Sequence, residues 1–426
     1  MPSSIAAPEG QLSRRDKFRA YMQAFNPTAP AAEMIEAGRV CEDLHHYLFR
    51  NLAGRADLEP GSQQLLVGGV GSGKTTELLL AGRWLLGQGN VLPLYLDVSA
   101  ETDLASLNAG SLLAAFGVLL GGSVVRDAEA RAAESDRLQK LKEAHAKITE
   151  YAYGKEVKRR VEPMATMAVD PALMRWVQGY FVSEKVPGKL KPPLPVLNRD
   201  LQVTQSPLNE FLTSVRESSK DVVVIFDGLD RLLDAAKFWS VVHQDLRLLR
   251  RLKVSVIATA PLSVLFGVGV GQSISDHFDK IHHLTVIPSE SAGASLSSVL
   301  ERRRGTGLLP GLLPYTIVEF SGGVLRDLIS LARDAAEEAY VSDRDSITLA
   351  DIEKVANQLG NSYLRGLGPE AIETLLKLAG TKSIDLSKPE NVELLLTRRV
   401  LEYSSTDFRV HPALLSVIPR PEPKRA

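Results

Sequence analysis

Five short apolar runs, separated by longer segments with helical spacing, dominate the first two thirds of the chain. The runs are rich in Val, Ile and Leu and lack the strict alternation of a strand with one face in water. Such runs are typical of parallel strands that are covered on both faces. Because strands alternate with helices, we expect a doubly wound α/β domain across residues 64–287. The runs span residues 64–67, 91–98, 221–227, 254–259 and 281–286.

The pattern changes after Pro288, where apolar residues recur at helical spacing only. Four helices are predicted first, and Thr348 or Ser346 is the expected N-cap of the last one. Two further helices and a short strand pair follow, an order that suits a winged helix. Helices are also expected over residues 14–25 and 32–52. The C-terminal helices are predicted at 295–303, 314–320, 323–340, 349–359, 368–378 and 394–401, and the strands near 401–403 and 408–410.

Composition limits the classes of protein to which the chain can belong. Its 426 residues are too many for one compact core, so two or three domains are expected. A formal net charge of −1 gives no global basic field for nucleic acid, and the single Cys41 excludes an intrachain disulfide framework. Uncharged runs at 104–125 and 254–275 are long enough to span a bilayer, but polar residues and Pro261 interrupt them. We therefore expect a cytoplasmic protein without membrane contact.

A glycine-rich stretch between the first strand and a helix fits the phosphate-binding loop pattern, which is Gly, four residues, then Gly-Lys-Ser/Thr. Its glycines allow the backbone to turn N–H groups inward as an anion nest, and the following helix points its N-terminal dipole at the same place. Lys74 is expected to bind the phosphates and Thr75 to bind Mg²⁺. The predicted nucleotide-binding loop is Gly68, Gly69, Val70, Gly71, Ser72, Gly73, Lys74, Thr75 and Thr76.

Hydrolysis at such a loop needs an acid at the end of a neighbouring strand. The run that ends at Asp227 provides one, and Asp227 is expected to hold Mg²⁺ through water. Position 228 is glycine, so Asp230 is the candidate for polarising the attacking water. The alternative is that Asp230 caps a helix after a core strand.

The residues Phe226-Asp227-Gly228-Leu229-Asp230 resemble the strand motif of the STAND class of signalling ATPases, which includes the NACHT group. The layout of the chain from about residue 35 to 415 is similar to the origin-recognition-like branch of the AAA+ superfamily. This resemblance implies ATP as the nucleotide, with a helical lid and a winged helix after the P-loop domain. Where AAA+ machines carry glutamate, this chain has Gly228, which favours slow hydrolysis that serves as a switch.

The resemblance also implies roles for residues outside the two motifs, and each has a structural alternative. Gly38 and Arg39 match a Gly-Arg box near adenine, or they belong to an ordinary helix that contains a glycine. Thr259 matches sensor 1 or is a plain strand-terminal threonine. Arg326 lies where sensor 2 is expected, although the family's proline is missing; otherwise it is a surface arginine. His411 resembles the winged-helix histidine that touches the β-phosphate of ADP, or it is a packed core residue.

The predicted fold is therefore an α/β P-loop NTPase domain with a doubly wound parallel sheet, followed by an all-α lid domain and a winged-helix domain. The predicted ranges are an N-terminal extension at 1–30, the ATPase domain at 31–288 with a charged helical insertion at about 126–205, the lid at 289–362, the winged helix at 363–418 and a disordered tail at 419–426.

The predicted function is that of a Mg²⁺-dependent ATPase that hydrolyses ATP slowly and couples ATP or ADP to domain packing. Its expected partners are a separate effector or sensor protein and further copies of itself in a nucleotide-dependent oligomer. The alternative is an ATP-regulated initiator or loader that binds DNA through the winged helix. That domain is only mildly basic, because its acidic residues Asp385, Glu390, Glu393 and Glu402 offset Lys377, Lys382, Lys388, Arg398, Arg399, Arg409 and the tail at 420–425.

Overall fold

The computed structural model describes residues 13–101, 103–131, 133–153, 201–232, 234–266, 274, 276–303 and 307–419. Contacts divide the chain into two compact units. The sheet unit comprises Tyr47–Gly68 and Lys74–Leu284, and the helical unit comprises Met1–His46, Gly69–Gly73 and Thr285–Ala426. The start of the predicted N-terminal extension, residues 154–200 of the predicted insertion and the tail from 420 lie outside the described residues. The predicted domain ranges stay a prediction.

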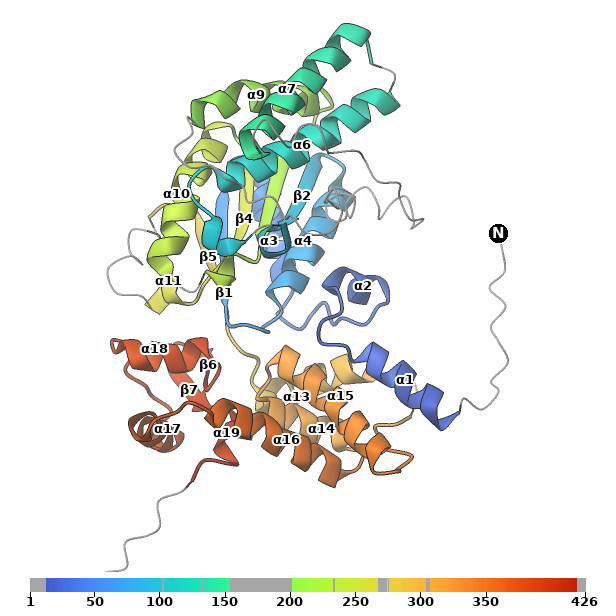
Figure 1. Cartoon of the computed structure of the whole chain (residues 1–426), viewed down its shortest axis with the longest axis vertical. Helices are drawn as coiled ribbons and strands as arrows, with labels where there is room; N and C mark the ends of the chain where they lie inside the picture. The colour runs from blue at the N-terminus through green and yellow to red at the C-terminus, as the bar shows by residue number, and fades with distance from the viewer. Residues whose placement is uncertain are drawn as a thin grey trace, which may run out of the picture. The chain divides into compact units, whose positions relative to one another are not determined.

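A five-stranded parallel sheet forms the centre of the sheet unit (Figure 1). The strand order is β2-β3-β4-β1-β5, so the first strand lies between the fourth and fifth. Each of the five predicted apolar runs falls on one of these strands, and the predicted α/β fold class is confirmed. The strands are β1 Gln63–Gly68, β2 Val91–Asp97, β3 Asp221–Asp227, β4 Ser255–Ala260 and β5 Lys280–Leu284.

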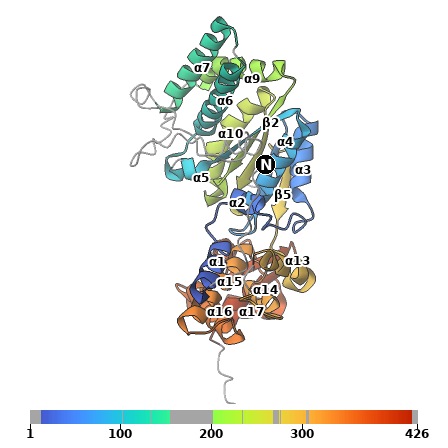
Figure 2. The ribbon, with the colours of Figure 1, turned by 90° about the vertical axis from the view of Figure 1, so that its right-hand side faces the viewer.

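Helices cover both faces of the sheet (Figure 2). Helices α3 and α4 pack on one face, and α6, α9 and α10 pack on the other. The central strands β1 and β4 are buried along their whole length, which explains why their sequences do not alternate between apolar and polar residues. The helices of this unit are α3 Leu48–Leu58, α4 Lys74–Gln88, α5 Val98–Glu101, α6 Ser111–Ala130, α7 Ser135–Tyr153, α9 Gln205–Glu217, α10 Ala235–Arg251 and α11 Ser263–Phe266.

Helix α6 carries the first uncharged run, and α7 carries the charged segment that follows it. The two helices pack against each other as a hairpin, and the described part of the charged segment after α6 is the single helix α7. Within the described part of the chain, α6 is the one helix long and apolar enough to cross a membrane. Its apolar window is 56% buried, and the helix contacts α7, α9, α10 and β2. These contacts are those of a packed helix of the sheet unit.

The predicted single helix over residues 32–52 is wrong. Helix α2 ends at Glu36, and α3 begins only at Leu48. Gly38 has a left-handed backbone with a φ of 65°, and its N–H and that of Arg39 bond back to carbonyls of α2. A residue in this conformation after the last turn is a common helix ending. The apolar spacing continues across the break, which is why it suggested one helix.

The helical unit buries one apolar core between α1 and the helices α13 to α16. Phe18 and Tyr21 of α1 belong to this core, so the N-terminal helix is part of the unit. The helical C-terminal region agrees with the predicted fold class. Its helices are α1 Arg14–Ala24, α2 Ala31–Glu36, α13 Ser289–Glu301, α14 Leu313–Ser321, α15 Leu325–Val341 and α16 Leu349–Leu364.

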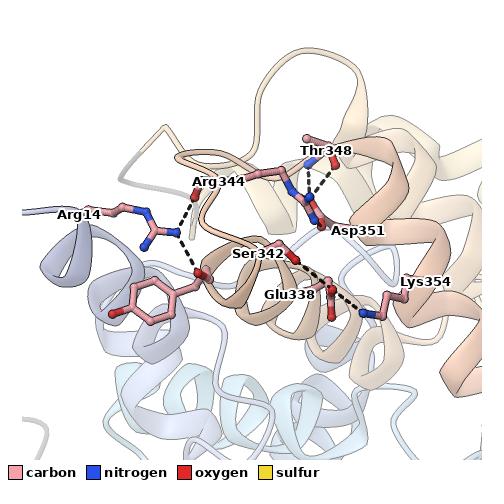
Figure 3. A network of polar contacts seen from close by, with 8 residues as sticks. Arg14, Glu338, Ser342, Arg344, Thr348, Asp351 and Lys354 are labelled. Atoms are coloured by element: carbon pink, nitrogen blue, oxygen red, sulfur yellow. Dashed lines mark hydrogen bonds and ion pairs between the residues drawn. The ribbon is translucent and has the colours of Figure 1, made fainter.

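Polar contacts close the turn between α15 and α16 (Figure 3). Arg14 donates to the carbonyl oxygens of Tyr340 and Arg344, each at 2.9 Å, so α1 is tied to this turn. Thr348 and Asp351 form a reciprocal capping box, and Arg344 pairs with the Asp351 carboxylate. Thr348 is therefore the N-cap of α16, the first of the two candidates predicted.

The end of the chain forms a small module with an antiparallel strand pair. Helix α17 contacts β7, and α18 contacts β6. The predicted helix over 394–401 is too late by about one turn, because its last residues belong to β6. The elements are α17 Pro369–Thr381, α18 Pro389–Leu396, β6 Val400–Ser404, β7 Asp407–Val410 and α19 Pro412–Leu415.

Candidate nucleotide-binding site

The predicted phosphate loop connects β1 to α4, with Gly68 at the end of the strand and Lys74 at the start of the helix. Lys74 is 5% exposed. Its Nζ donates to the Gly68 carbonyl oxygen at 2.9 Å and pairs with Asp230 Oδ2, also at 2.9 Å. Thr75 and Thr76 follow in the first turn of α4. The structure therefore joins the predicted lysine to one of the two predicted acids.

Asp227 lies at the carboxyl end of β3 and is buried. Its carboxylate accepts hydrogen bonds from the Tyr95 hydroxyl at 2.7 Å, from the Gly228 N–H at 2.7 Å, and from the Thr75 hydroxyl. Burial raises the pKa of Asp227, and the charges of Asp230 and Asp97 act in the same direction, while the bonds from Tyr95 and Thr75 oppose them. The two predicted Mg²⁺ ligands, Thr75 and Asp227, are thus in contact.

Tyr95 and Asp97 were missed by sequence reasoning. Asp97 ends β2 directly beside Asp227 in the parallel register, so its carboxylate is a third acid at this edge of the sheet. Asp97 Oδ1 accepts from the Ser99 N–H at 3.0 Å and the Ser99 hydroxyl at 2.6 Å. The position of Asp97 at a strand end was a usable signal, because carboxyl ends of parallel strands share one edge. Nothing in the spacing of Tyr95 indicated its bond to Asp227.

Gly228 has no room for a side chain. Its φ is +80°, and a Cβ atom would lie 2.8 Å from Asp97 Oδ1 and 2.8 Å from the Ser99 side chain. Both the backbone conformation and the close approach favour glycine here. A glutamate, which AAA+ machines carry at this position, would strain the backbone and displace the side chains of Asp97 and Ser99.

The turn after β3 is held by Thr259 of the neighbouring strand β4. The buried Thr259 hydroxyl accepts a hydrogen bond from the Leu229 N–H at 3.0 Å. Asp230 itself faces Lys74, and the N-cap of the next helix, α10, is Asp234, whose side chain accepts from the Ala236 N–H at 2.8 Å. The alternative interpretation of Asp230 as a helix cap is therefore wrong. The sensor role of Thr259 stays a prediction.

In the helical unit, the loop residues Gly69–Gly73 contact the start of α15. The Arg326 N–H donates to the Gly71 carbonyl oxygen at 3.4 Å, and a Cβ atom on Gly71 would lie 2.8 Å from the Arg326 Cβ. The backbone of the predicted sensor 2 residue therefore adjoins the loop. Arg39, by contrast, lies beyond the end of α2, where its charge adds to the effect of burial in lowering the pKa of Arg303 to about 10.

His411 is fully buried, as the alternative interpretation of it as a core residue supposed. Its Nε2 lies 3.2 Å from Asp327 Oδ2, and its Nδ1 accepts from the Ala413 N–H at 3.2 Å. Asp327 also accepts from the Tyr363 hydroxyl at 2.6 Å and from Arg398 at 2.7 Å. Both ring nitrogens of His411 are thus engaged in this conformation, and its predicted contact with ADP stays a prediction.

Comparison with known proteins gives structural likeness only. No protein-family model matches this chain, and no curated protein sequence matches it. The chain is similar to the ORC2 protein of Aeropyrum pernix solved as ADPNP–ADP complexes, with 13% identity and a TM-score of 0.41 over 86% of this chain and 88% of that one. It is similar to Drosophila ORC bound to DNA, with 11% identity and a TM-score of 0.44 over 89% and 76%. It is also similar to CDC6P from Pyrobaculum aerophilum, with 11% identity and a TM-score of 0.38 over 92% and 96%. Since each TM-score lies below 0.5, residue roles are inferred from the contacts of this chain alone.

Proposed function

We propose that this chain binds ATP with Mg²⁺ through the loop Gly68 to Thr76 and hydrolyses it slowly. The observation that carries the proposal is the contact of Lys74 with Asp230, beside the bonded pair Thr75 and Asp227. A loop of this sequence needs a lysine for the phosphates and acids at the neighbouring strand end. Within the sheet unit, those residue types lie together at one edge of the sheet.

The residues at this edge fit a magnesium ion that arrives with the nucleotide. Three carboxylates, Asp97, Asp227 and Asp230, lie close enough that the charges of the other two raise the pKa of Asp227. A divalent cation would relieve that repulsion and neutralise phosphate charge. Within the described ranges, no group of three or more His, Cys, Asp or Glu side chains could hold a metal by itself. Thr75 and Asp227 would therefore hold Mg²⁺ together with phosphate oxygens, an arrangement typical of P-loop proteins.

The ion pair between Lys74 and Asp230 gives the two residues linked roles. The Lys74 ammonium group already reaches the Gly68 carbonyl oxygen and the Asp230 carboxylate with its three donors, so a phosphate attracted to its charge would weaken the pair with Asp230. Once Lys74 turns to phosphate, Asp230 is released and can orient the attacking water. In this proposal the acid is paired until the nucleotide is present, and Thr259 fixes its position through the Leu229 N–H.

Slow turnover and a switching role follow from the same turn. Gly228 leaves the site without the glutamate of AAA+ machines, and in this proposal Asp230 takes the role of acting on water. Contacts to the γ-phosphate exist only before hydrolysis, so the ATP and ADP forms differ in what they stabilise. The proposal includes a separate effector or sensor protein, and a nucleotide-dependent homo-oligomer. Each would bind or assemble differently with the ATP form and the ADP form.

The DNA-binding alternative gains no support from the arginines of the terminal module. Arg398 pairs with Asp327, Arg399 donates to the carbonyls of Tyr363 and Arg365, and Arg409 pairs with Asp407. Arginines committed to internal partners are poorly placed for phosphates of DNA. We therefore propose no second function.

Equilibrium titration with a fluorescent ATP analogue and Mg²⁺ tests the proposed function. Lys74→Ala should weaken binding by at least about ten-fold, because a charge-assisted bond to phosphate is lost. Lys280→Ala is the matched control. Lys280 is an exposed lysine of the same unit, and it lies at the amino end of β5, whereas the predicted site lies at the carboxyl ends of the strands. Equal affinity of the Lys74→Ala variant and the wild type would contradict the proposal.

A further inference from the structure

His45 is held against the phosphate loop by the core of the helical unit. Its neighbours Cys41 and Leu44 are buried in that core. A Cβ atom placed on Gly73 would lie 3.1 Å from His45 Nε2, and Gly73 has a φ of +103°. The imidazole therefore lies close to the backbone of Gly73, in space that a side chain at position 73 would partly fill.

Two buried polar atoms at this place have no hydrogen-bond partner among the described residues: His45 Nε2 and Ser72 Oγ. Leaving a buried polar group unpaired costs about 1–3 kcal/mol, so native structures rarely contain one without a reason. Here both atoms belong to, or adjoin, the segment Gly69–Gly73, whose sequence is that of a phosphate-binding loop.

The His45 imidazole is neutral near pH 7. Burial lowers its pKa to about 4, a hydrogen bond to the Ser72 backbone acts in the opposite direction, and the charge of His46 lowers it further. A neutral imidazole carries one N–H donor, and its other nitrogen is an acceptor. Because the bond to the Ser72 backbone raises the pKa, it is a bond that the ring donates, so an anion would have to draw this N–H away from Ser72 or share it. With either change, the ring offers a bond to an anion without holding a permanent charge inside the unit.

We propose that His45 Nε2 is a ligand of the phosphate chain of the nucleotide, donating a hydrogen bond to one of its oxygens. The inference rests on the proposed function, because it assumes that Gly69–Gly73 bind phosphate. The Ser72 hydroxyl is the second unpaired group beside it. On binding, the Ser72 hydroxyl would gain its first partner, and the His45 ring would exchange or share its bond to the Ser72 backbone for one to phosphate. Phosphate binding would thereby offset the cost of burying these groups. His45 is thus a binding residue more than 20 positions upstream of the motif.

The test compares His45→Phe, His45→Gln and the control His46→Asn. His46 is the exposed neighbour with a φ of 53°, a conformation that asparagine tolerates. Affinities for Mg²⁺·ATP and for inorganic tripolyphosphate are measured by calorimetry, and thermal midpoints are measured without ligand. His45→Phe removes the unpaired nitrogen, so its ligand-free midpoint should equal or exceed that of the wild type. Its affinity for both ligands should fall about ten-fold or more. His45→Gln, which keeps an N–H donor, should recover part of that loss, and His46→Asn should bind as the wild type does.

Several results would overturn the assignment. If His45→Phe binds both ligands as tightly as the wild type, the nitrogen does not contact phosphate. If it loses affinity for ATP but not for tripolyphosphate, the contact is to the nucleoside. If the ligand-free midpoint falls in parallel with affinity and His45→Gln recovers neither, the role of His45 is structural. Failure of the wild type itself to bind ATP would instead refute the proposed function, so the two failures are distinguishable.

Discussion

Lys74 and Asp230 neutralise each other at the carboxyl edge of the sheet, and each is largely shielded from water. An ion pair with little solvent contact is costly to break unless a new partner replaces the lost one. A phosphate group is such a partner for Lys74, whereas the released Asp230 gains contact with water. Under the proposed function, the pair would therefore couple nucleotide binding by the loop to the release of Asp230.

Asp230→Asn tests this coupling. The amide cannot compete with phosphate for Lys74 as a charge does, so ATP affinity should equal or exceed that of the wild type. Turnover should fall by at least about ten-fold, since an amide is a poor proton acceptor. Both are measured in one series of binding and phosphate-release assays, with Asp221→Asn at the opposite end of β3 as control. Loss of ATP binding in Asp230→Asn would show that its role is misassigned.

Gly228→Ala tests the crowding of the turn between Asp227 and Asp230. Gly89 has the same φ of +80°, but a Cβ atom placed on it would have no neighbouring atom within 4 Å, so Gly89→Ala measures the backbone effect alone. Gly228→Ala should lower the free energy of unfolding by about 1–3 kcal/mol more than Gly89→Ala does, as read from urea titrations. Equal effects of the two substitutions would mean that Asp97 and Ser99 move aside easily.

At the residue scale, sequence spacing alone predicted Lys74, Thr75, Asp227 and Asp230 as site residues, and the structure brings Lys74 to Asp230 and Thr75 to Asp227. The loop motif and the end of an apolar run fix those positions because local chain geometry determines them. Asp97 and His45 could not be assigned in the same way. Their roles depend on which strand lies beside β3 and on how residues 41–45 are anchored in a core, and both are tertiary facts.

At the element scale, the start of α4 is joined to the start of α3 by a buried carboxyl group. Glu77 Oε2 accepts a hydrogen bond from the Phe49 N–H at 2.8 Å and so satisfies one of the free donors at the beginning of α3. Burial raises the pKa of Glu77 to about 7, and the bond from Phe49 opposes that rise. The helix after the phosphate loop is thereby attached to its neighbour through a group that titrates near neutral pH.

Glu77→Gln should therefore change how stability depends on pH. The folded protein keeps Glu77 protonated up to about pH 7, whereas the unfolded chain ionises near 4.5, so the folded state binds more protons between these values. Wild-type stability should fall across that window relative to Glu77→Gln, by roughly 1–3 kcal/mol at pH 8. Urea unfolding at pH 5, 6, 7 and 8 measures the difference, with the exposed Glu210→Gln as control. A constant difference across this range would contradict the assignment.

Strands were easier to predict than helix limits. Strands β3 and β4 are mostly apolar runs because both of their faces are covered, and such a run is visible without knowledge of its neighbours. The break between α2 and α3 depends on left-handed backbone at Gly38, His46 and Tyr47. The last two are not glycine, so their residue types gave no sign of this conformation, and the apolar spacing suggested one helix.

At the scale of the whole molecule, the proposal requires that ATP and ADP favour different states. Sedimentation velocity with Mg²⁺·ADP and with a non-hydrolysable ATP analogue should give different sedimentation coefficients, through altered domain packing or altered oligomer size. Lys74→Ala should show no difference between the two nucleotides. Identical profiles of the wild type with both nucleotides would contradict the proposed switching role, although ATP binding itself would remain possible.

A single-turnover measurement tests the central claim most directly. Wild-type protein in excess over radiolabelled ATP and Mg²⁺ is sampled from seconds to hours, and ATP and ADP are separated at each time. We expect bound ATP to be converted fully to ADP at a rate well below the roughly 10 per second typical of enzymes. Asp230→Asn should hold ATP without converting it, and Lys74→Ala should neither hold nor convert it. Conversion by Asp230→Asn at the wild-type rate, or intact ATP in the wild type after hours, would contradict the proposed mechanism.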